Sequence, residues 1–524
     1  MQTTLPDLLT EGAQRAPDQK AFSCGNEAIT YRLLNERSDQ LAAFLQSQNV
    51  LPGDRVAILL NRSLLGPLAI YAVLKTGAIY VPLDPSSPPE ILREIITDCE
   101  VKIIISDSPF QEKLSSIVTK DSSLDLTIIG TETGGFSWKT IQDFDAPFIS
   151  RPLKASDRAY LLYTSGSTGS PKGIIHTHES GLAYARLASE LFQITSKDRI
   201  GSHSPIHFDM STFGLFAGPY ATATTIIIPD AHIKFPASLA ALIESEQITI
   251  WYSVPFVLQQ LIPNGLLLNR NLKHLRWILY AGEECASGLA FQLMEQLPQV
   301  RLGNVYGPTE TNQCTFYEIQ TLTSPPAASY SFPIGQPWTE TSALILEGDQ
   351  VAPPGAKGEL AIASPTLMEG YWKREPLNEK VFIWQDTTEG PKRFYRTGDL
   401  ASWSEKKQLL FHGRIDRQIK IRGYRIELDG IEKILSNHPN IKEAAIYLQS
   451  TDKQVGIEAA CSVHPDTSSL TAQQIHDYLS LKIPSYSLPE KIRLLSELPR
   501  TPSDKIDRQT LMQHSQIDSN DKKN

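Results

Sequence analysis

Cysteine is scarce in this sequence. The five cysteines of the 524 residues, Cys24, Cys99, Cys285, Cys314 and Cys461, are odd in number and scattered along the chain. A disulfide framework needs paired cysteines, and a cysteine-based zinc site needs closely spaced ones. The sequence has neither pattern, which favours a reducing compartment.

Runs of basic residues and long apolar runs are also absent. The net charge is −9 at pH 7 and no run of five Lys or Arg residues occurs, so a nucleic-acid backbone binder is disfavoured. Apolar segments such as Val56–Leu60 and Thr225–Pro229 are too short to span a bilayer. The first residues, MQTTLPDLLTEG, lack the basic start and apolar stretch of a secretory signal. These absences predict a soluble, cytoplasmic enzyme with neither nucleic acid nor membrane as a partner.

The order of apolar patterns along the chain predicts an α/β fold. Short β-branched runs such as Arg55–Leu60 and Val101–Ser106 alternate with helix-like stretches such as Ser38–Ser47 and Ser238–Ser245. This alternation is typical of parallel sheets connected by helices. From Gly335 onward, glycine-punctuated strands predict a small, antiparallel, β-barrel-like subdomain.

The chain is too long for one compact core, and its last hundred residues differ in character. After Gly413 a strand-like Gln418–Ile421 and a helix-like Asp429–Asn437 follow in a more charged segment, so we place the main boundary near Arg414–Lys420. We therefore predict a large N-terminal domain of parallel α/β sheets over residues 1–413. A small, mobile α+β C-terminal domain is expected over residues 414–512. Residues 513–524 are polar and are expected to be disordered.

The most informative local feature is LLYTSGSTGSPKG, which spans Leu161–Gly173. A short apolar strand enters a loop of hydroxyl side chains, glycines and a lysine: Thr164, Ser165, Gly166, Ser167, Thr168, Gly169 and Lys172. Glycines let successive backbone N–H groups approach an anion closely, and the hydroxyls and the ammonium add donors and charge. The spacing differs from that of a Walker A loop, so the pattern predicts a phosphate-binding loop of another kind.

This loop is one of nine segments that together resemble the adenylate-forming superfamily, and specifically the adenylation domains of non-ribosomal peptide synthesis. The resemblance covers nearly the whole chain. In order, the segments are ITYRLLNERSDQLA (Ile29–Ala42), LKTGAIYVPLDP (Leu74–Pro85), YTSGSTGSPKG, HFDMS (His207–Ser211), NVYGPTE (Asn304–Glu310), GELAIASPTLMEGYW (Gly358–Trp372), YRTGDL (Tyr395–Leu400), GRIDRQIKIRGYRIEL (Gly413–Leu428) and PRTPSDKIDR (Pro499–Arg508).

The resemblance implies an ATP site. Asn304 is expected to meet the edge of the adenine and Tyr306 to stack on the base. Glu310 is expected to hold Mg²⁺ beside the phosphates, because carboxylate and phosphate oxygens suit this hard ion. Asp399, which has no cation beside it in TGDL, is expected to accept hydrogen bonds from the ribose, and Arg414 to reach the ribose and phosphate region. The expected nucleotide-binding set is completed by the phosphate loop and by Gly282, Gly307 and Thr309.

Lys505 is the predicted catalytic residue, together with Glu310. Attack of a carboxylate on the α-phosphate builds up negative charge, which a positioned ammonium stabilises. The family usually has glycine immediately before this lysine, whereas this chain has Asp504. That difference leaves the conformation of the loop open. The resemblance also implies that the C-terminal domain rotates about a hinge near Asp416, which moves Lys505 between the two half-reactions.

Asp209 in HFDMS indicates the class of carboxylic acid. In the family, an aspartate at this position pairs with the α-ammonium group of an amino acid, whereas an acyl chain would leave the carboxylate unpaired. By resemblance, the pocket consists of Asp209, Met210, Phe213, Tyr252, Leu279, Ala281, Val305, Gln313, Cys314 and Lys505. Most of these residues are apolar, which suits a small, uncharged side chain.

This pocket most resembles that of L-proline–[peptidyl carrier protein] ligases, although Gln313 is polar where an apolar residue is expected. The predicted reaction is activation of L-proline to prolyl-AMP. Transfer to the phosphopantetheine thiol of a carrier protein is predicted to follow, in natural-product biosynthesis. No carrier-domain serine motif or condensation-domain histidine motif is present, so a separate carrier protein is expected. The alternatives are a D-alanine or other small amino acid–carrier protein ligase, an acyl- or aryl-CoA ligase, and a non-catalytic nucleotide-binding regulator.

Overall fold

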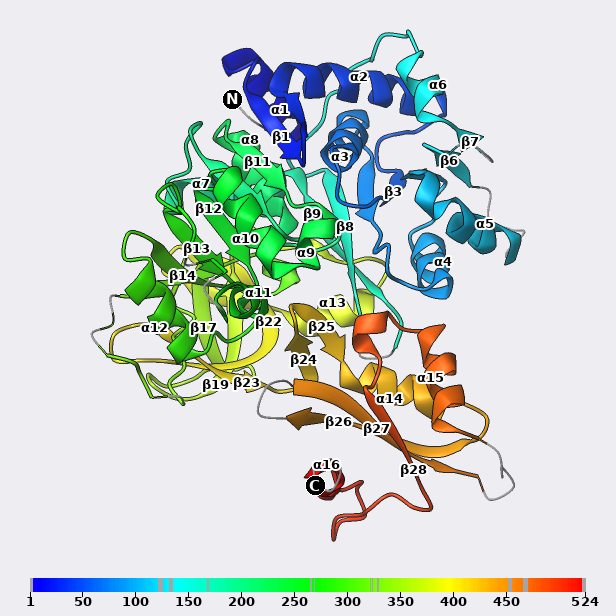
Figure 1. Cartoon of the computed structure of the whole chain (residues 1–524), viewed down its shortest axis with the longest axis vertical. Coiled ribbons are helices and arrows are strands. Elements are labelled where there is room, and N and C mark those ends of the chain that lie inside the picture. The colour runs from blue at the N-terminus through cyan, green and yellow to red at the C-terminus, as the bar shows by residue number, and fades with distance from the viewer. Residues whose placement is uncertain are drawn as a thin grey trace.

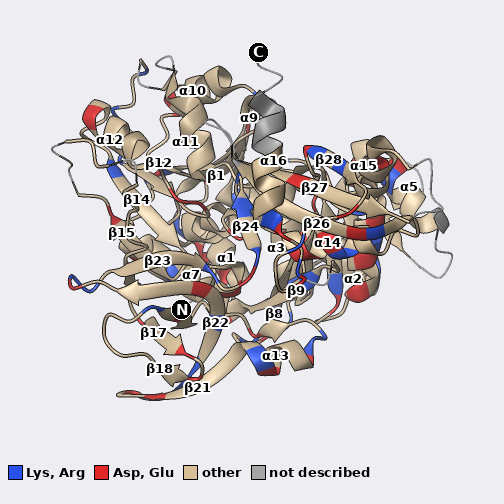
Figure 2. Cartoon of the chain, turned by 90° about the horizontal axis from the view of Figure 1, so that it is seen from below, with Lys and Arg blue, Asp and Glu red and all other residues tan. Residues whose placement is uncertain are grey.

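The computed structural model in Figure 1 describes residues 3–120, 126–131, 135–166, 169–263, 266–267, 269–320, 322, 324–327, 329–450, 455–464 and 470–520. Two large sheets with helices on their faces form the N-terminal part, which confirms the mixed α/β class. None of the described helices is long and apolar enough to cross a membrane. Lys/Arg and Asp/Glu residues intermingle over the described chain, without a basic stripe (Figure 2).

The first sheet has nine strands. Its central strands, from β1 to β14, are parallel, and three antiparallel strands lie at its ends. In spatial order the strands are β16 (Gln336–Pro337), β15 (Thr315–Glu318), β14 (Arg301–Tyr306), β13 (Trp277–Tyr280), β12 (Ile250–Ser253), β10 (Arg199–Ser202), β11 (Thr224–Ile227), β1 (Lys20–Cys24) and β2 (Glu27–Thr30).

The second sheet has eight strands, and the predicted phosphate loop connects two of them. Strands β8 and β9 form the antiparallel hairpin around that loop, whereas β4 pairs parallel with β8 and with β3. In spatial order the strands are β20 (Gly370–Tyr371), β9 (Lys172–Thr177), β8 (Arg158–Thr164), β4 (Ile79–Pro82), β3 (Arg55–Leu59), β5 (Ile103–Ser106), β6 (Thr127–Ile129) and β7 (Gly135–Phe136).

Helix α3 (Leu65–Thr76) is buried from Gly66 to Thr76, because its apolar residues occur on every side. It lies in a core that also receives side chains from α1, α2, β1 and the second sheet. The N-terminal helices are α1 (Leu5–Arg15), α2 (Tyr31–Ser47), α3, α4 (Pro89–Asp98), α5 (Gln111–Lys120), α6 (Trp138–Gln142), α7 (His178–Leu191), α8 (Gly218–Tyr220), α9 (Asp230–Ile233), α10 (Pro236–Ser245), α11 (Pro255–Leu261), α12 (Ser287–Gln296) and α13 (Glu375–Val381).

The segment after Gly335 forms the expected antiparallel sheet. Its order is β18 (Gln350–Val351), β17 (Ser342–Glu347), β19 (Gly358–Ala363), β22 (Gly390–Trp403) and β21 (Phe382–Thr387), and β23 (Leu409–Arg414) also pairs with β22. Among the described residues this pairing is a branched path that does not return to its first strand. Strand β22 is long enough to pair with three neighbours, β19, β21 and β23.

The chain leaves the antiparallel sheet at Arg414 and enters a smaller α+β region. This region contains a hairpin of β24 (Gln418–Ile421) and β25 (Tyr424–Glu427), followed by a sheet of β26 (Ile441–Ser450), β27 (Val455–Val463) and β28 (Lys491–Leu495). Helices α14 (Leu428–Ser436) and α15 (Ala472–Ser480) share its core. In Figure 1, β24, β25 and α14 lie toward the large sheets, and β26–β28 lie farther away.

The end of the chain differs from the prediction. Helix α16 runs over Arg508–Asn520, so most of the tail that we expected to be disordered is helical. Leu511 in its first half is fully buried against the β26–β27 core, which anchors the start of the helix. Residues 521–524 lie outside the described part of the chain.

Candidate active site

A cavity of about 750 Å³ lies between the large sheets and the β24–β25 hairpin. Its walls come from both regions, so residues far apart in the sequence share one space. Sixteen of the predicted site residues line it, namely Thr164, Ser165, Gly166, Gly169, Asp209, Met210, Ala281, Gly282, Asn304, Val305, Tyr306, Gly307, Thr309, Gln313, Asp399 and Arg414. Ser167 and Thr168 lie outside the described residues.

The phosphate loop begins where β8 ends, at Thr164, which lines the cavity. The hydroxyl oxygen of Thr164 is buried and has no hydrogen-bond partner among the described residues. Gly169 has φ +89°, and a Cβ there would lie 3.3 Å from Ile434 of α14. A buried hydroxyl without a partner, close to a backbone conformation that glycine favours, is suited to binding the phosphates of a nucleotide.

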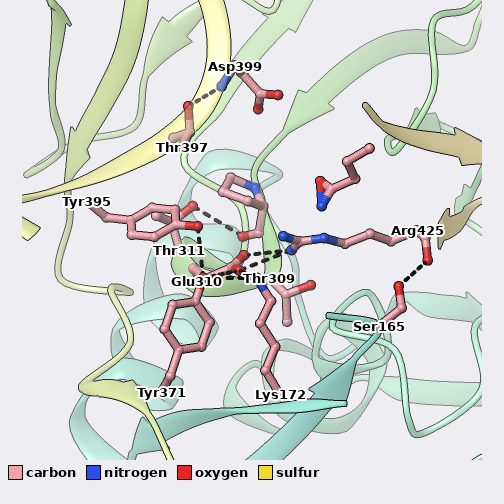
Figure 3. Close-up of polar contacts among 12 residues, drawn as sticks. Ser165, Lys172, Thr309, Glu310, Thr311, Tyr371, Tyr395, Thr397, Asp399 and Arg425 are labelled. Carbon is pink, nitrogen blue, oxygen red and sulfur yellow. Dashed lines mark hydrogen bonds and ion pairs between the residues drawn. The ribbon is translucent and has the colours of Figure 1, made fainter. Parts of the chain in front are cut away.

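Glu310 is the most heavily engaged carboxylate of the site. Its side chain is fully buried, and Arg425 Nη1 lies 3.1 Å from Oε1 and 3.0 Å from Oε2 (Figure 3). Tyr371 donates a hydrogen bond of 2.6 Å to Oε1, and Lys172 Nζ lies 3.7 Å from that oxygen. Burial alone would raise the pKa of Glu310, but Arg425 and Lys172 hold it below its usual range. Burial and the neighbouring Arg425 lower the pKa of Lys172 to about 8.

Three of the residues predicted to bind the nucleoside, Tyr306, Asp399 and Arg414, contact one another. Tyr306 donates a hydrogen bond of 2.5 Å from its hydroxyl to Asp399, and Arg414 Nη1 lies 2.5 Å from the other carboxylate oxygen. Asn304 donates its amide N–H to the Pro333 carbonyl at 2.8 Å. Asp399 has no cationic neighbour within TGDL, but it has one in the folded chain. Arg414, fifteen residues later, reaches it because β22 and β23 pair with Asp399 opposite Arg414.

Asp209 lies in the same cavity, against an apolar wall. Its Oδ1 accepts the backbone N–H of Met210 at 2.7 Å. Burial raises its pKa, while the Thr309 side chain and the Lys420 ammonium lower it. Behind it, Met210, Ala281 and Val305 of the cavity wall share one core cluster with Phe213, Tyr252 and Leu279. The Phe213 and Tyr252 rings of this cluster meet edge to face at 5.3 Å.

The comparisons with known proteins agree on a family. Residues 9–372 match the model of the AMP-binding enzyme and residues 430–505 that of the AMP-binding enzyme C-terminal domain. The chain belongs to the AMP-binding enzyme family. It is 32% identical to tyrocidine synthase 1 of Brevibacillus parabrevis over 97% of its own length, but spans only 45% of that protein.

Two further relatives extend this picture of the AMP-binding enzyme. A dimodular nonribosomal peptide synthase of Bacillus subtilis (strain 168) is 32% identical over 97% of the chain, which covers 21% of that protein. The structure of NpsA-ThdA, an artificially fused adenylation-PCP di-domain from Klebsiella oxytoca, superposes with a TM-score of 0.79 at 25% identity. The alignment covers 94% of this chain and 93% of that one. The chain is therefore an enzyme whose fold matches adenylation domains.

The placement of Lys505 differs from the prediction that it lines the amino-acid pocket. In this AMP-binding enzyme Lys505 is exposed and is not among the residues lining the cavity. Its backbone N–H donates to the Thr501 hydroxyl within a tight turn. The hairpin β24–β25 contributes Lys420 to the lining of the cavity, and the positive charge of Lys420 acts on the carboxylate of Asp209. Asp504 adopts φ +62°, the left-handed conformation that the usual glycine favours.

Cys314 does not belong to the predicted pocket wall either. Cys314 is fully buried in the core cluster of the antiparallel sheet, with Ile334 and Leu360. It is not part of the cluster that contains Met210. Gln313, its neighbour, does line the cavity. Its Oε1 accepts a hydrogen bond from the Tyr184 hydroxyl, so the polar group that departs from the expected pattern has a partner within the protein.

Three side chains of the site were not predicted from the sequence: Lys420, Arg425 and Tyr371. All three lie in segments that carry the family resemblance, but nothing local in those segments indicates that Arg425 meets Glu310, 115 residues earlier. The predicted Mg²⁺ site does not fit this arrangement. Both oxygens of Glu310 already contact a guanidinium, and the described residues contain no cluster of three His, Cys, Asp or Glu side chains that could hold a metal ion.

Proposed function

We propose that this enzyme activates a small amino acid with ATP, and that L-proline is its preferred substrate. A carboxylate oxygen of the amino acid attacks the α-phosphorus of ATP, the bond to the bridging oxygen breaks, and pyrophosphate leaves. In the second half-reaction a phosphopantetheine thiol attacks the acyl carbon, loses its proton, and displaces AMP. A separate carrier protein is the proposed thiol donor.

The observation that carries this proposal is the position of Asp209. Its carboxylate shares one cavity with the phosphate loop, Asn304 and Tyr306. A carboxylate beside a nucleotide site suits the ammonium group of an amino acid, whereas a fatty or aryl acid offers it no charged group to bind. The relatives described above, a nonribosomal peptide synthase and an adenylation-PCP di-domain among them, support the same class of reaction.

The apolar end of the pocket supports a compact, uncharged side chain. Phe213, Tyr252 and the fully buried Leu279 share one core cluster with Met210 and Val305 of the cavity wall. The residues of this cluster are apolar or aromatic and offer no countercharge to an acidic or basic side chain. The Tyr184 hydroxyl donates a hydrogen bond to the side-chain oxygen of Gln313, so this oxygen has a partner without the substrate. Gln313 is therefore compatible with an apolar ring such as that of proline.

A movement of the C-terminal region is part of the proposal, because Lys505 lies outside the cavity. The hinge proposed at Asp416 is held by Arg414, whose Nε lies 2.7 Å from Oδ1 and whose Nη2 lies 2.8 Å from Oδ2. We propose that Lys505 enters the cavity for the first half-reaction, and that the described arrangement, with Lys420 in place, serves the second. Such rotations occur where a few hinge residues absorb a large change of the backbone dihedral angles.

Amino-acid-dependent exchange of pyrophosphate into ATP tests the proposal directly. Of a panel of amino acids, L-proline should give the highest kcat/KM. A preference for alanine, D-alanine or valine would rule out proline while keeping the class of reaction. Absence of exchange with every amino acid would rule out the class. Incubation with proline, ATP and a phosphopantetheinylated carrier should add the mass of one prolyl group to the carrier.

A further inference from the structure

Asn312 lies just after the nucleotide-binding segment, and its backbone has an unusual conformation. It follows the 3₁₀ turn Thr309–Thr311 and has φ +56° and ψ −114°. These angles match the first central residue of a type II′ turn, a position that glycine favours because it has no Cβ. An asparagine is strained there. Strained residues persist where the surrounding structure imposes their conformation, and they cluster at functional sites.

The backbone of Asn312 holds the turn that carries Glu310. Its N–H donates to the Thr309 carbonyl at 3.2 Å. Its own carbonyl packs against Gly307, where an added Cβ would lie 2.0 Å from that oxygen. The chain therefore folds back onto the end of β14 so closely that position 307 has no room for a side chain. The strained conformation of Asn312 is part of this close packing.

The side chain of Asn312 reaches toward the amino-acid pocket. Its Nδ2 donates a hydrogen bond of 3.2 Å to the Thr212 hydroxyl, and its Oδ1 lies 3.4 Å from the same oxygen. That hydroxyl donates in turn to the backbone carbonyl of Asp209 at 2.6 Å. Both the Asn312 and the Thr212 side chains are buried, which shields these bonds from competing water. A path of hydrogen bonds therefore connects the turn of Glu310 to Asp209.

The relative position of these two segments decides how the two substrates meet. In the proposed function, Asp209 binds the ammonium group of the amino acid, and the segment that ends at Glu310 binds the nucleotide. The carboxylate oxygen of the amino acid must meet the α-phosphorus in the right geometry, and a misplacement of about 1 Å can lower the rate about a hundredfold. A rigid link between the two segments preserves this geometry.

We propose that Asn312 is a positioning residue that aligns the amino acid with the nucleotide. It is not among the residues that line the cavity, so it acts through Thr212 and Asp209 on one side and through the turn of Glu310 on the other. The inference rests on the proposed function, because it takes an amino acid and ATP as the two reactants.

Replacement of Asn312 by glycine separates alignment from folding. Glycine adopts the observed backbone angles without strain, so Asn312→Gly keeps the turn and removes only the contact with Thr212. In proline-dependent pyrophosphate exchange with the full-length protein, kcat should fall at least about tenfold, while the KM for ATP should change by less than about twofold. The midpoint of unfolding in urea should stay near that of the wild type, because relief of strain offsets the lost hydrogen bond.

Substitutions of Thr212 test the same link from its other end. Thr212→Val removes the hydroxyl and should lower kcat by a similar factor, whereas Thr212→Ser keeps a hydroxyl and should retain most of the rate. The double variant of Asn312→Gly and Thr212→Val should lose little more than either single variant, because the effects of contacting residues are not additive. These two Thr212 variants also decide the question if Asn312→Gly does not fold.

Thr76→Val is the matched control. Thr76 is buried like Thr212, and its hydroxyl also donates to the carbonyl three residues earlier, that of Val73, at 2.7 Å. It lies in helix α3 and does not line the cavity. The same chemical change is therefore made away from the site, and it should leave kcat unchanged.

The outcomes distinguish this inference from the proposed function. Normal exchange in the wild type with an unchanged kcat in Asn312→Gly, or with additive losses in the double variant, would overturn the positioning role and leave the proposed function standing. Retention of the full rate by Thr212→Val would do the same. Absence of exchange with every amino acid in the wild type would overturn the proposed function, and the inference that rests on it would fail with it.

Discussion

Replacement of Asp209 by asparagine tests how the enzyme recognises an amino acid. Asparagine keeps nearly the same shape and can still accept the Met210 N–H, which lies 2.7 Å from Oδ1. It removes only the negative charge from a group that burial has largely separated from water. A bound α-ammonium would then lie in the cavity without its countercharge.

The expected loss follows from the burial of this carboxylate. Removing one partner of a buried ion pair costs about 3 kcal/mol or more. At about 1.4 kcal/mol per factor of ten, kcat/KM for L-proline should fall about a hundredfold. The loss should be specific to substrates with an ammonium group, because the nucleotide-binding residues are unchanged.

Pyrophosphate exchange with two acids measures this specificity. One is L-proline, and the other is tetrahydrofuran-2-carboxylate, in which an oxygen replaces the ring nitrogen. The wild type should prefer proline strongly, and Asp209→Asn should lose most of that preference. Glu284→Gln, which removes a negative charge from another carboxylate lining the cavity, should keep it. An equal loss of activity toward both acids in Asp209→Asn, or no loss at all, would refute the proposed role of this carboxylate.

Two further predictions concern pH and stability. Burial raises the pKa of Asp209, and the carboxylate carries its charge only above that pKa. The KM for the amino acid should therefore rise at acidic pH before the KM for ATP does. A KM for the amino acid that stays constant over the acidic range would contradict this. Asp39→Ala should lower the free energy of unfolding in urea by about 2 kcal/mol, because it removes the 2.7 Å contact of the buried Lys75 ammonium. Lys75→Met in the same chain should recover most of this loss, and a double variant no more stable than Asp39→Ala would show that the contact matters little.

Much of the fold could be predicted because its signals are local. The helical spacing in Ser238–Ser245 and the β-branched run Arg55–Leu60 are patterns of a few residues, and both elements were confirmed as α10 and β3. Helix α16 was not predicted from the sequence, since the polar composition of this segment does not reveal that Leu511 anchors the helix in the C-terminal core.

The candidate site was predictable where one short segment supplies the chemistry. Ser165, Gly166 and Gly169 after β8 line the cavity, as does Asp209. The prediction failed where two segments had to meet. Cys314 follows Gln313 in the sequence, yet the two side chains lie in different environments, because neighbouring residues of an extended segment point to opposite sides.

The sequence by itself determined the family, the alternation of strands and helices, and the residue types available for gripping phosphates and an ammonium group. Only the tertiary structure decided which cations reach the cavity. It brought Arg425 to Glu310 and Lys420 into the cavity that Asp209 lines, and it left Lys505 in solvent. The physical reason is that periodicity and turn chemistry act over a few residues. The placement of a second domain depends instead on ion pairs and hydrogen bonds between segments more than a hundred residues apart, which no local pattern records.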